Sequence, residues 1–443
     1  MTQETRPNII FIVADDLGYA DLGCYGGRPE PFGAVSPVLD RLAAEGLRFT
    51  QGYSNSPVCS PTRFALMTAR WQYRLRGAAE EPINARSKGS TTLGLRPEHP
   101  TLPSLLQAAG YRTALMGKWH LGYPPAFGPL KSGYEEFFGP MSGGVDYFTH
   151  CSNSGVHDLY LGEHEHHADG YITDLITERA IDWLRRMSSQ SADAPLFMSL
   201  HYTAPHWPWE TRDDRALAQE VKDNLFHLHG GNVHTYKRMI HHMDEGIGRV
   251  VDTLRELGRL DNTLIVFTSD NGGERFSDNW PLVGGKMDLT EGGIRVPWIA
   301  HWPAQIAPGG VTAQQCLTMD WSATLLDAAG VAAHPDYPLD GVSLLPVLRE
   351  PAAAFDRPLF FRMNHRGQRA HRDGDWKYLR VDGHDYLFNI PADERERANL
   401  AAREPERLQS LRAAWEAWDA SMPPIPADAT VSLGYSVRDM PQR

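Results

Sequence analysis

Short apolar runs alternate with longer helical patterns over most of the chain. Five of these runs are apolar almost throughout and lack the alternating polar residues of a half-buried strand. Such runs are typical of strands in a parallel sheet that helices cover on both faces. The predicted strands comprise residues 9–14, 113–116, 196–201, 264–268 and 297–300.

Helix start signals and amphipathic patterns lie between the predicted strands. A Ser-Pro pair at residues 36–37 predicts one helix start, and Thr101 predicts another. Residues 171–187 and 235–257 repeat apolar side chains at intervals of three and four, which predicts two long helices with one apolar face each. We expect both to pack on the sheet.

The pattern changes after about residue 350. Short strand candidates interrupted by polar residues cover 359–362, 377–381 and 386–389, and a helix is predicted near 405–417. We therefore predict an α/β fold with a large mixed, mostly parallel sheet between helices, and a smaller C-terminal antiparallel sheet with one helix. The corresponding domains are residues 1–350 and 351–443.

Length, composition and charge limit the possible partners. With 443 residues and 42% hydrophobic content, the chain is long enough for a large core and too long for one ordinary domain. The net charge is −12, and no block of Lys and Arg could follow a phosphate backbone. Nucleic acid is therefore an unexpected partner.

No apolar segment reaches the length of a membrane span, so we expect no membrane partner. The first residues show no signal sequence, which predicts a cytoplasmic protein if Met1 is the native start. A leader removed from the natural chain would make the periplasm the expected location. The four cysteines are widely scattered, which favours reduced thiols over a disulfide framework.

Polar side chains follow four of the predicted strands. Ligands of an open α/β sheet bind at the carboxyl ends of its strands, so we expect these side chains to share one edge. A single aspartate after a strand is commonly a helix cap or turn residue, but three crowded aspartates repel one another unless a cation neutralises them. Oxygen ligands select a hard ion such as calcium or magnesium. The residues concerned are Asp15, Asp16, Lys118, His120, His206, Asp270 and Asn271.

Cys59 lies just before a segment of helical character. Pro61 suits the first turn of that helix, so Cys59 is predicted beside a helix N-terminus, where free N–H groups and the helix dipole favour an anion. Most cysteines are simply small buried apolar residues. The neighbouring residues decide between these readings.

The segment Cys59-Ser60-Pro61-Thr62-Arg63 matches the C-x-P-x-R signature of formylglycine-dependent sulfatases. The chain resembles this type I, arylsulfatase-like family of the alkaline phosphatase superfamily in further blocks, which follow the family's order from about residue 7 to 400. These blocks begin at Pro7, Asp15, Gly117, Ser269, Gly285, Glu291 and Gly374. The resemblance implies an alkaline-phosphatase-like fold.

The resemblance implies hydrolysis of aryl or carbohydrate sulfate monoesters to an alcohol and inorganic sulfate. A maturase would oxidise Cys59 to formylglycine, whose hydrate carries the nucleophilic hydroxyl. One divalent metal is implied, with Ca²⁺ expected and Mg²⁺ a second option. The implied metal ligands are Asp15, Asp16, the modified Cys59, Asp270 and Asn271.

The resemblance also implies roles for cationic and imidazole side chains. Arg63, one helical turn after Cys59, would reach back towards it and the carboxylates. Lys118 and His120 would flank the formylglycine, with His120 as base, and we expect their i, i+2 spacing on a strand-like segment to put both on one face. His206 and Lys286 would bind sulfate, and one of them would protonate the leaving oxygen.

Two other functions fit the same residues. A phosphonate monoester hydrolase or phosphodiesterase would use the same nucleophile and metal to attack phosphorus. A protein that binds sulfate esters without turnover would result if Cys59 were never converted. The sequence leaves open the alcohol half of the substrate and the oligomeric state.

Overall fold

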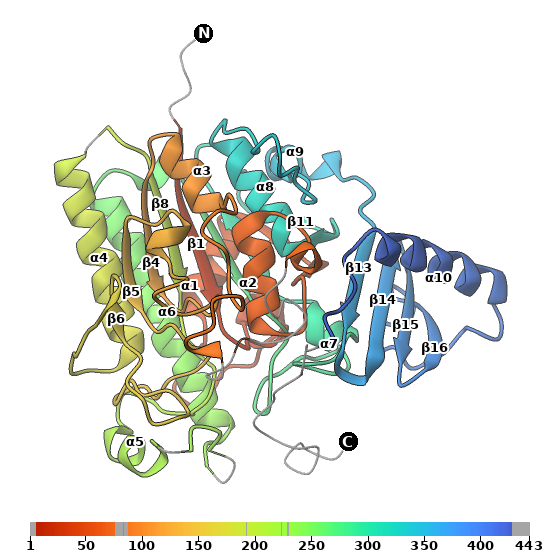
Figure 1. Cartoon of the computed structure of the whole chain (residues 1–443), viewed down its shortest axis with the longest axis horizontal. Helices are drawn as coiled ribbons and strands as arrows, with labels where there is room; N and C mark the ends of the chain where they lie inside the picture. The colour runs from red at the N-terminus through yellow and green to blue at the C-terminus, as the bar shows by residue number, and fades with distance from the viewer. Residues whose placement is uncertain are drawn as a thin grey trace.

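A computed structural model of the chain describes residues 6–75, 83, 87–191, 193–222, 224–227 and 230–427. Its larger part is built around one large sheet, and a small sheet with a covering helix lies beside it (Figure 1). This arrangement confirms the predicted fold class. Within the described ranges, no helix combines the length and apolar character that a membrane span requires.

The large sheet has ten strands in the order β11-β2-β10-β9-β1-β8-β4-β5-β6-β7. The five predicted strands are confirmed as the neighbours β10, β9, β1, β8 and β4. Strands β9, β1, β8, β4 and β5 run parallel, whereas β10 is antiparallel to β9. In chain order the strands are β1 Asn8–Ala14, β2 Leu47–Phe49, β4 Arg112–Gly117, β5 Glu136–Gly139, β6 Tyr160–Leu161, β7 His164–Glu165, β8 Leu196–His201, β9 Thr263–Ser269, β10 Trp298–His301 and β11 Gly310–Thr312.

Alternate residues of β1 point into two separate hydrophobic cores. Ile10 and Ile12 pack with helices α1, α4 and α6, whereas Ile9 and Phe11 pack with α2, α3, α8 and α9 on the other face. All of β1 is buried, which explains its unbroken apolar run. The helices are α1 Pro37–Ala44, α2 Cys59–Thr68, α3 Leu102–Ala108, α4 Ile172–Gln190, α6 Val233–Glu256, α8 Thr318–Ala328 and α9 Leu345–Arg349.

The predicted helix starts and amphipathic helices are confirmed. Helix α1 begins at Pro37, and Thr101 caps α3 by accepting a hydrogen bond from the main-chain N–H of Ser104. Helices α4 and α6 lie against each other on the sheet. The remaining short elements are α5 Arg215–Val221, α7 Glu291–Ile294 and a two-stranded parallel sheet of β3 Gly52–Tyr53 and β12 Cys316–Leu317.

The small sheet is an antiparallel meander of four strands, of which three were predicted. The missed strand is β14, where five of six residues are polar or charged, so it has no apolar pattern. Helix α10 packs against β14 and β15. The elements are β13 Leu359–Met363, β14 Gln368–Asp373, β15 Trp376–Val381, β16 His384–Asn389 and α10 Pro405–Ala420.

The small sheet shares a hydrophobic core with the larger part. Tyr53, Val58 and Ala65 belong to the same buried cluster as Phe361 and Leu379. The β3 and α2 region that includes Cys59 therefore rests directly on the C-terminal sheet. The division at residue 350 remains a prediction.

Candidate active site

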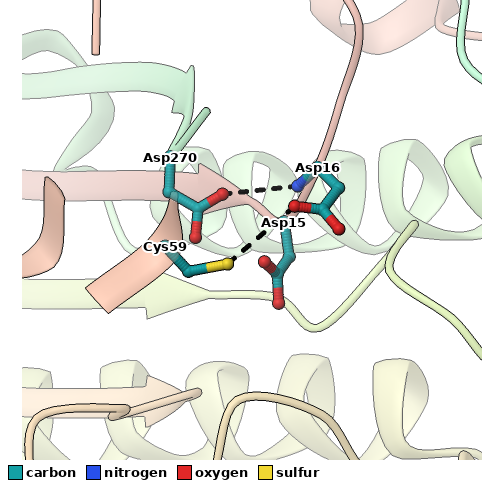
Figure 2. A group of neighbouring side chains, drawn as sticks. All are labelled: Asp15, Asp16, Cys59 and Asp270. Carbon is teal, nitrogen blue, oxygen red and sulfur yellow. Dashed lines mark hydrogen bonds between the residues drawn. The ribbon is translucent and has the colours of Figure 1, made fainter. Parts of the chain in front are cut away.

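The tips of β1 and β9 lie side by side, because these parallel neighbours are paired along their full length. The chain therefore places Asp15 and Asp16 beside Asp270 at the carboxyl edge of the sheet (Figure 2). The main-chain N–H of Asp16 donates to Asp270 Oδ1 at 3.3 Å, and Asn271 Nδ2 donates to Asp16 Oδ1 at 2.7 Å. The four predicted side chains at these two tips thus form one group.

Cys59 is the first residue of α2, as the position of Pro61 predicts. Its Sγ lies 3.9 Å from Asp16 Oδ1. One ligand atom from each of Asp15, Asp16, Cys59 and Asp270 lies within 4.8 Å of the others, and all four residues are buried. The N-terminus of α2 adds the positive end of its dipole to this point.

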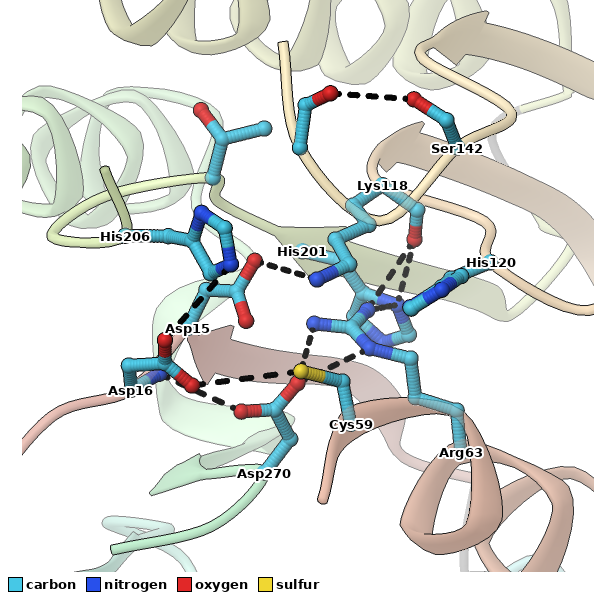
Figure 3. A network of polar contacts seen from close by, with 12 residues as sticks. Asp15, Asp16, Cys59, Arg63, Lys118, His120, Ser142, His201, His206 and Asp270 are labelled. Atoms are coloured by element: carbon cyan, nitrogen blue, oxygen red, sulfur yellow. Dashed lines mark hydrogen bonds and ion pairs between the residues drawn. The ribbon is translucent and has the colours of Figure 1, made fainter. Parts of the chain in front are cut away.

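Each of the three carboxylates has a cationic partner that is almost fully buried, and the network is drawn in part in Figure 3. The ion pairs are Arg63 Nη2 with Asp270 Oδ2 at 2.8 Å, Lys118 Nζ with Asp15 Oδ2 at 2.5 Å and Lys286 Nζ with Asp16 Oδ2 at 2.7 Å. Arg63 Nε also donates to Asp270 Oδ2, at 3.0 Å. Three negative and three positive side chains therefore balance in formal charge.

The pKa values of Asp15 and Asp270 shift in opposite directions. Burial, reinforced by the nearby charge of Asp270, raises the pKa of Asp15 to about 7, and Lys118 only partly offsets this. Burial also acts to raise the pKa of Asp270, but Arg63 and Lys118 outweigh it and lower that pKa. The pKa of the Cys59 thiol is raised well above its usual value by burial and by Asp270, so an unmodified Cys59 is a protonated thiol and a weak nucleophile.

Lys118 and His120 lie beyond the end of β4 in irregular chain, so the expectation of a strand-like i, i+2 spacing is wrong. Strand β4 ends at Gly117, whose φ is +116°, and His120 has a φ of +59°. His120 Nε2 lies 2.5 Å from the carbonyl oxygen of Ile83. Burial, together with Lys118, lowers the pKa of His120 well below its usual value, so the ring is neutral. Because a carbonyl only accepts, Nε2 carries the hydrogen, and the buried Nδ1 keeps a free lone pair.

His206 faces the carboxylates through Nε2. His206 Nδ1 donates to the carbonyl oxygen of Trp207 at 2.8 Å, and Nε2 lies 3.6 Å from Asp16 Oδ2. Burial, together with Lys286 and Lys118, lowers the pKa of His206 well below its usual value. All of the predicted site residues therefore meet at one edge of the sheet.

The sulfatase family profile matches residues 7–331, and these residues include every side chain of the site. The chain belongs to the sulfatase family. It is a sulfuric ester hydrolase, related to enzymes that act on aryl and carbohydrate sulfates.

Individual relatives of this sulfatase cover most of its length. It is 32% identical to N-acetylgalactosamine-6-sulfatase of Homo sapiens, over 80% of this chain and 68% of the relative. It is 32% identical to arylsulfatase A of Homo sapiens, over 91% and 81% of the two chains. Among solved structures, Ps i-CgsB in complex with k-i-k-neocarrahexaose is similar with a TM-score of 0.83 and 30% identity, over 94% of both chains.

The sulfatase site offers oxygen atoms that fit a metal ion. Asp15 Oδ1 and Asn271 Oδ1 are buried and have no hydrogen-bond partner, although a buried acceptor without a partner is costly. Both oxygens belong to predicted ligands. A set of carboxylate and amide oxygens suits a hard divalent ion. Across the described ranges, this is the sole group of three or more acidic, His or Cys side chains close enough to hold a metal.

Two residues of the site were missed in the sequence. His201, the last residue of β8, is buried with Nδ1 3.3 Å from Arg63 Nη1 and 3.3 Å from the carbonyl oxygen of Lys118. Burial raises the pKa of Glu274 to about 7. Lys286 opposes this rise, and Asp16 adds to it. His201 could have been found by inspecting the final residue of each predicted strand as well as the residues after it.

Proposed function

We propose that this sulfatase hydrolyses sulfate monoesters of carbohydrates, with formylglycine at position 59 and one divalent metal, Ca²⁺ by preference. The observation that carries the proposal is the convergence of Asp15, Asp16, Asp270 and Cys59 within 4.8 Å at the start of a helix. With Asn271, these residues would hold the ion. A divalent cation there supplies Lewis acidity towards the sulfate oxygens.

The charge balance of the site supports an anionic substrate. The three carboxylates are already matched by Arg63, Lys118 and Lys286. A bound divalent ion would therefore leave an excess of positive charge, in a buried setting where electrostatic attraction is strong. A sulfate monoester carries one negative charge, and more charge accumulates on the leaving oxygen as the ester bond breaks.

The state of Cys59 supports the need for its modification. Its pKa is raised by burial and by Asp270, which keeps the thiol protonated. Formylglycine at this position supplies, as its hydrate, one hydroxyl that attacks sulfur and a second whose deprotonation allows sulfate to leave. The maturase that performs the oxidation is the protein partner that we infer.

The other side chains of the site have separate roles in the proposed reaction. Arg63 and Lys118 fix the orientation of Asp270 and Asp15. His120 accepts the proton of the second hydroxyl at Nδ1, the nitrogen that has a free lone pair. Lys286 and His206 both face Asp16. Lys286 binds the sulfate oxygens and donates the proton to the departing alcohol, whereas His206 can take either role only as the imidazolium ion, because the neutral ring holds its hydrogen on Nδ1.

The carbohydrate preference rests on the relatives. N-acetylgalactosamine-6-sulfatase is named for a sugar sulfate, and the Ps i-CgsB structure contains a carrageenan oligosaccharide. Trp207 extends an aromatic surface beside the site, with its ring centroid 4.1 Å from that of His206 and 4.6 Å from that of Phe226. Aromatic faces of this kind can stack on a sugar ring.

The test compares the converted enzyme on four esters: sulfated galactose or N-acetylgalactosamine, a sulfated neocarra-oligosaccharide, an aryl sulfate and an aryl phosphonate monoester. We expect kcat/KM to be highest for one of the sugar sulfates. A higher kcat/KM for the phosphonate would reject the sulfatase assignment of the site in favour of phosphonate hydrolysis. A higher value for the aryl sulfate would reject the carbohydrate preference.

The state of residue 59 is checked on the same samples. Mass spectrometry of the peptide that contains Cys59 should show the loss of mass that accompanies oxidation to formylglycine, and activity should scale with the converted fraction. Equal activity from fully unconverted protein would overturn the proposed nucleophile. A fully unconverted peptide from the native host would favour binding without turnover.

A further inference from the structure

The segment that carries Lys286 has a strained backbone, and hydrogen bonds to neighbouring segments hold it in place. Met287, the next residue, has a φ of +77°, a conformation that side chains other than glycine rarely adopt. The N–H of Met287 donates to the carbonyl oxygen of Pro57 at 2.9 Å, two residues before Cys59. A strained residue persists only where its surroundings fix it, so the contacts of this segment determine where the Lys286 ammonium lies.

Gln368, the first residue of β14, makes two further hydrogen bonds to the main chain of this segment. Its Oε1 accepts the N–H of Leu289 at 2.8 Å, and its Nε2 donates to the carbonyl oxygen of Met287, also at 2.8 Å. Gln368 is 2% exposed, so these bonds do not compete with solvent. One side-chain amide of the small sheet therefore brackets the main chain immediately after Lys286.

A buried ion network holds the far end of the same segment. Glu291, the first residue of α7, accepts from Lys377 Nζ of β15 at 2.9 Å and from the Tyr53 hydroxyl at 2.7 Å. Its main-chain N–H donates to Glu396 Oε2 at 2.7 Å, and Lys377 also pairs with Glu396 Oε1 at 2.8 Å. Burial acts to raise the pKa of Glu291, but Lys377, Arg372 and Arg295 outweigh it and lower that pKa to about 2.

The small sheet thus contacts the segment from Met287 to Glu291 at three points: two through Gln368 and one through the ion network. All of these side chains are almost fully buried, and none reaches the carboxylate cluster itself. The two bonds of Gln368 end on the main chain that follows Lys286, so any effect of this side chain on the reaction passes through that main chain.

We infer that the C-terminal sheet positions the active site, and that Gln368 is a positioning residue for Lys286. The inference rests on the proposed role of Lys286 as a sulfate ligand. Without the Gln368 amide, the main chain at Met287 loses one of the two hydrogen bonds that hold its strained conformation, and the Lys286 ammonium moves away from its place beside Asp16. A displacement of about 1 Å at a reacting group can lower a rate about 100-fold.

The experiment is a double-mutant cycle on the converted, metal-loaded enzyme, with the best substrate of the panel above. The variants are Gln368→Ala, Lys286→Ala and the double variant, and kcat, KM and Tm are measured for each. Gln314→Ala is the matched control. Gln314 is 3% exposed and likewise brackets main-chain groups, accepting from Phe355 N–H at 2.8 Å and donating to Phe355 O at 3.0 Å.

We expect Gln368→Ala and Gln314→Ala to lower Tm by a similar few degrees, since each removes comparable buried hydrogen bonds. Only Gln368→Ala should lower kcat/KM, by about 100-fold. In the Lys286→Ala background, Gln368→Ala should lower kcat/KM by no more than about threefold, because the group that it positions is gone. Gln368→Asn, shorter by one methylene, should fall between wild type and Gln368→Ala, and replaces it in the cycle if that variant does not fold.

Equal factors for Gln368→Ala in the wild-type and Lys286→Ala backgrounds would overturn the inference and leave the proposed function intact. Wild-type kcat/KM for Lys286→Ala would remove Lys286 from the reaction and the inference with it. A loss of activity in Gln314→Ala as large as that in Gln368→Ala would show a general effect of lost stability and would also overturn the inference.

Discussion

Asp15→Asn distinguishes the electrostatic destabilisation that the acidic cluster causes in the metal-free protein from its role in binding the metal. In the metal-free protein the Asp15 carboxylate is buried and lies near Asp270, and its pKa is raised to about 7. The unfolded chain releases this proton near the ordinary value of 3.8, so the folded state binds the proton more tightly. Stability therefore falls as pH rises from about 4 to about 7, and an uncharged asparagine of the same shape removes this decline.

The magnitude follows from the shift. At about 1.4 kcal/mol per pKa unit, a shift from 3.8 to about 7 corresponds to about 4 kcal/mol at pH 8 as an upper limit. We expect metal-free Asp15→Asn to be about 1 to 4 kcal/mol more stable than wild type at that pH. With calcium at 100 times its dissociation constant, wild type should gain about 2.7 kcal/mol, whereas the variant should gain far less because it lacks one charged ligand.

The assay is thermal or denaturant unfolding of both proteins at pH 8, in chelator and in excess calcium, with sulfate ester hydrolysis measured alongside. The expected pattern is a higher Tm for Asp15→Asn in chelator, a small calcium shift and a loss of activity of at least about 100-fold. A lower Tm for the variant in chelator would refute the electrostatic argument. An unchanged calcium shift would remove Asp15 from the proposed ligands.

Three further changes test residue 59, the pair of Arg63 with Asp270, and the buried ion network around Glu291. Cys59→Ala should abolish hydrolysis while the circular dichroism spectrum stays that of wild type; residual turnover would exclude residue 59 as nucleophile. Arg63→Lys loses the paired Nε and Nη2 contacts with Asp270, so kcat/KM should fall about 100-fold and stability by about 1 to 3 kcal/mol, checked by kinetics and urea unfolding. Burial raises the pKa of Glu396 to about 7, with Lys377 opposing the rise and Glu291 adding to it. The free energy of unfolding should therefore fall between about pH 4.5 and 7, and Glu396→Gln should reduce this fall by at most about 3 kcal/mol. Urea unfolding at several pH values measures the slope, and an unchanged slope would contradict the prediction.

The sequence alone determined the centre of the sheet and the strand tips of the site. The run from Ile9 to Ala14 is apolar because both faces of β1 are covered, and a strand of that kind has few alternative structures. Its next residue must lie at the carboxyl edge, which places Asp15 without knowledge of its neighbours. Pro61 likewise determined where α2 begins, because proline is accommodated in the first turn of a helix.

Other features depended on contacts between segments that are distant in the chain. Lys118 and His120 reach the site from irregular chain after β4, where Gly117 and His120 have a positive φ that no pattern of apolar residues predicts. Strand β14 carries mostly polar side chains because they bond to the segment after Lys286 and to the region of Tyr53, so its sequence looks like a loop. A periodic pattern of apolar residues reveals a strand only when its buried side chains are apolar. The buried side chains of β14 are mostly polar, so the pattern is absent.

The sequence therefore specified which local segments form the framework and which side chains their ends present, since these follow from short-range sterics and from the burial of apolar groups. Only the tertiary structure decided that Asp15 and Asp270 become neighbours through the pairing of β1 with β9, that each carboxylate receives its own cation, and that Gln368 reaches the main chain beside Lys286. Such polar contacts join groups from 81 to 270 residues apart, and their partners are determined by the packing of whole elements.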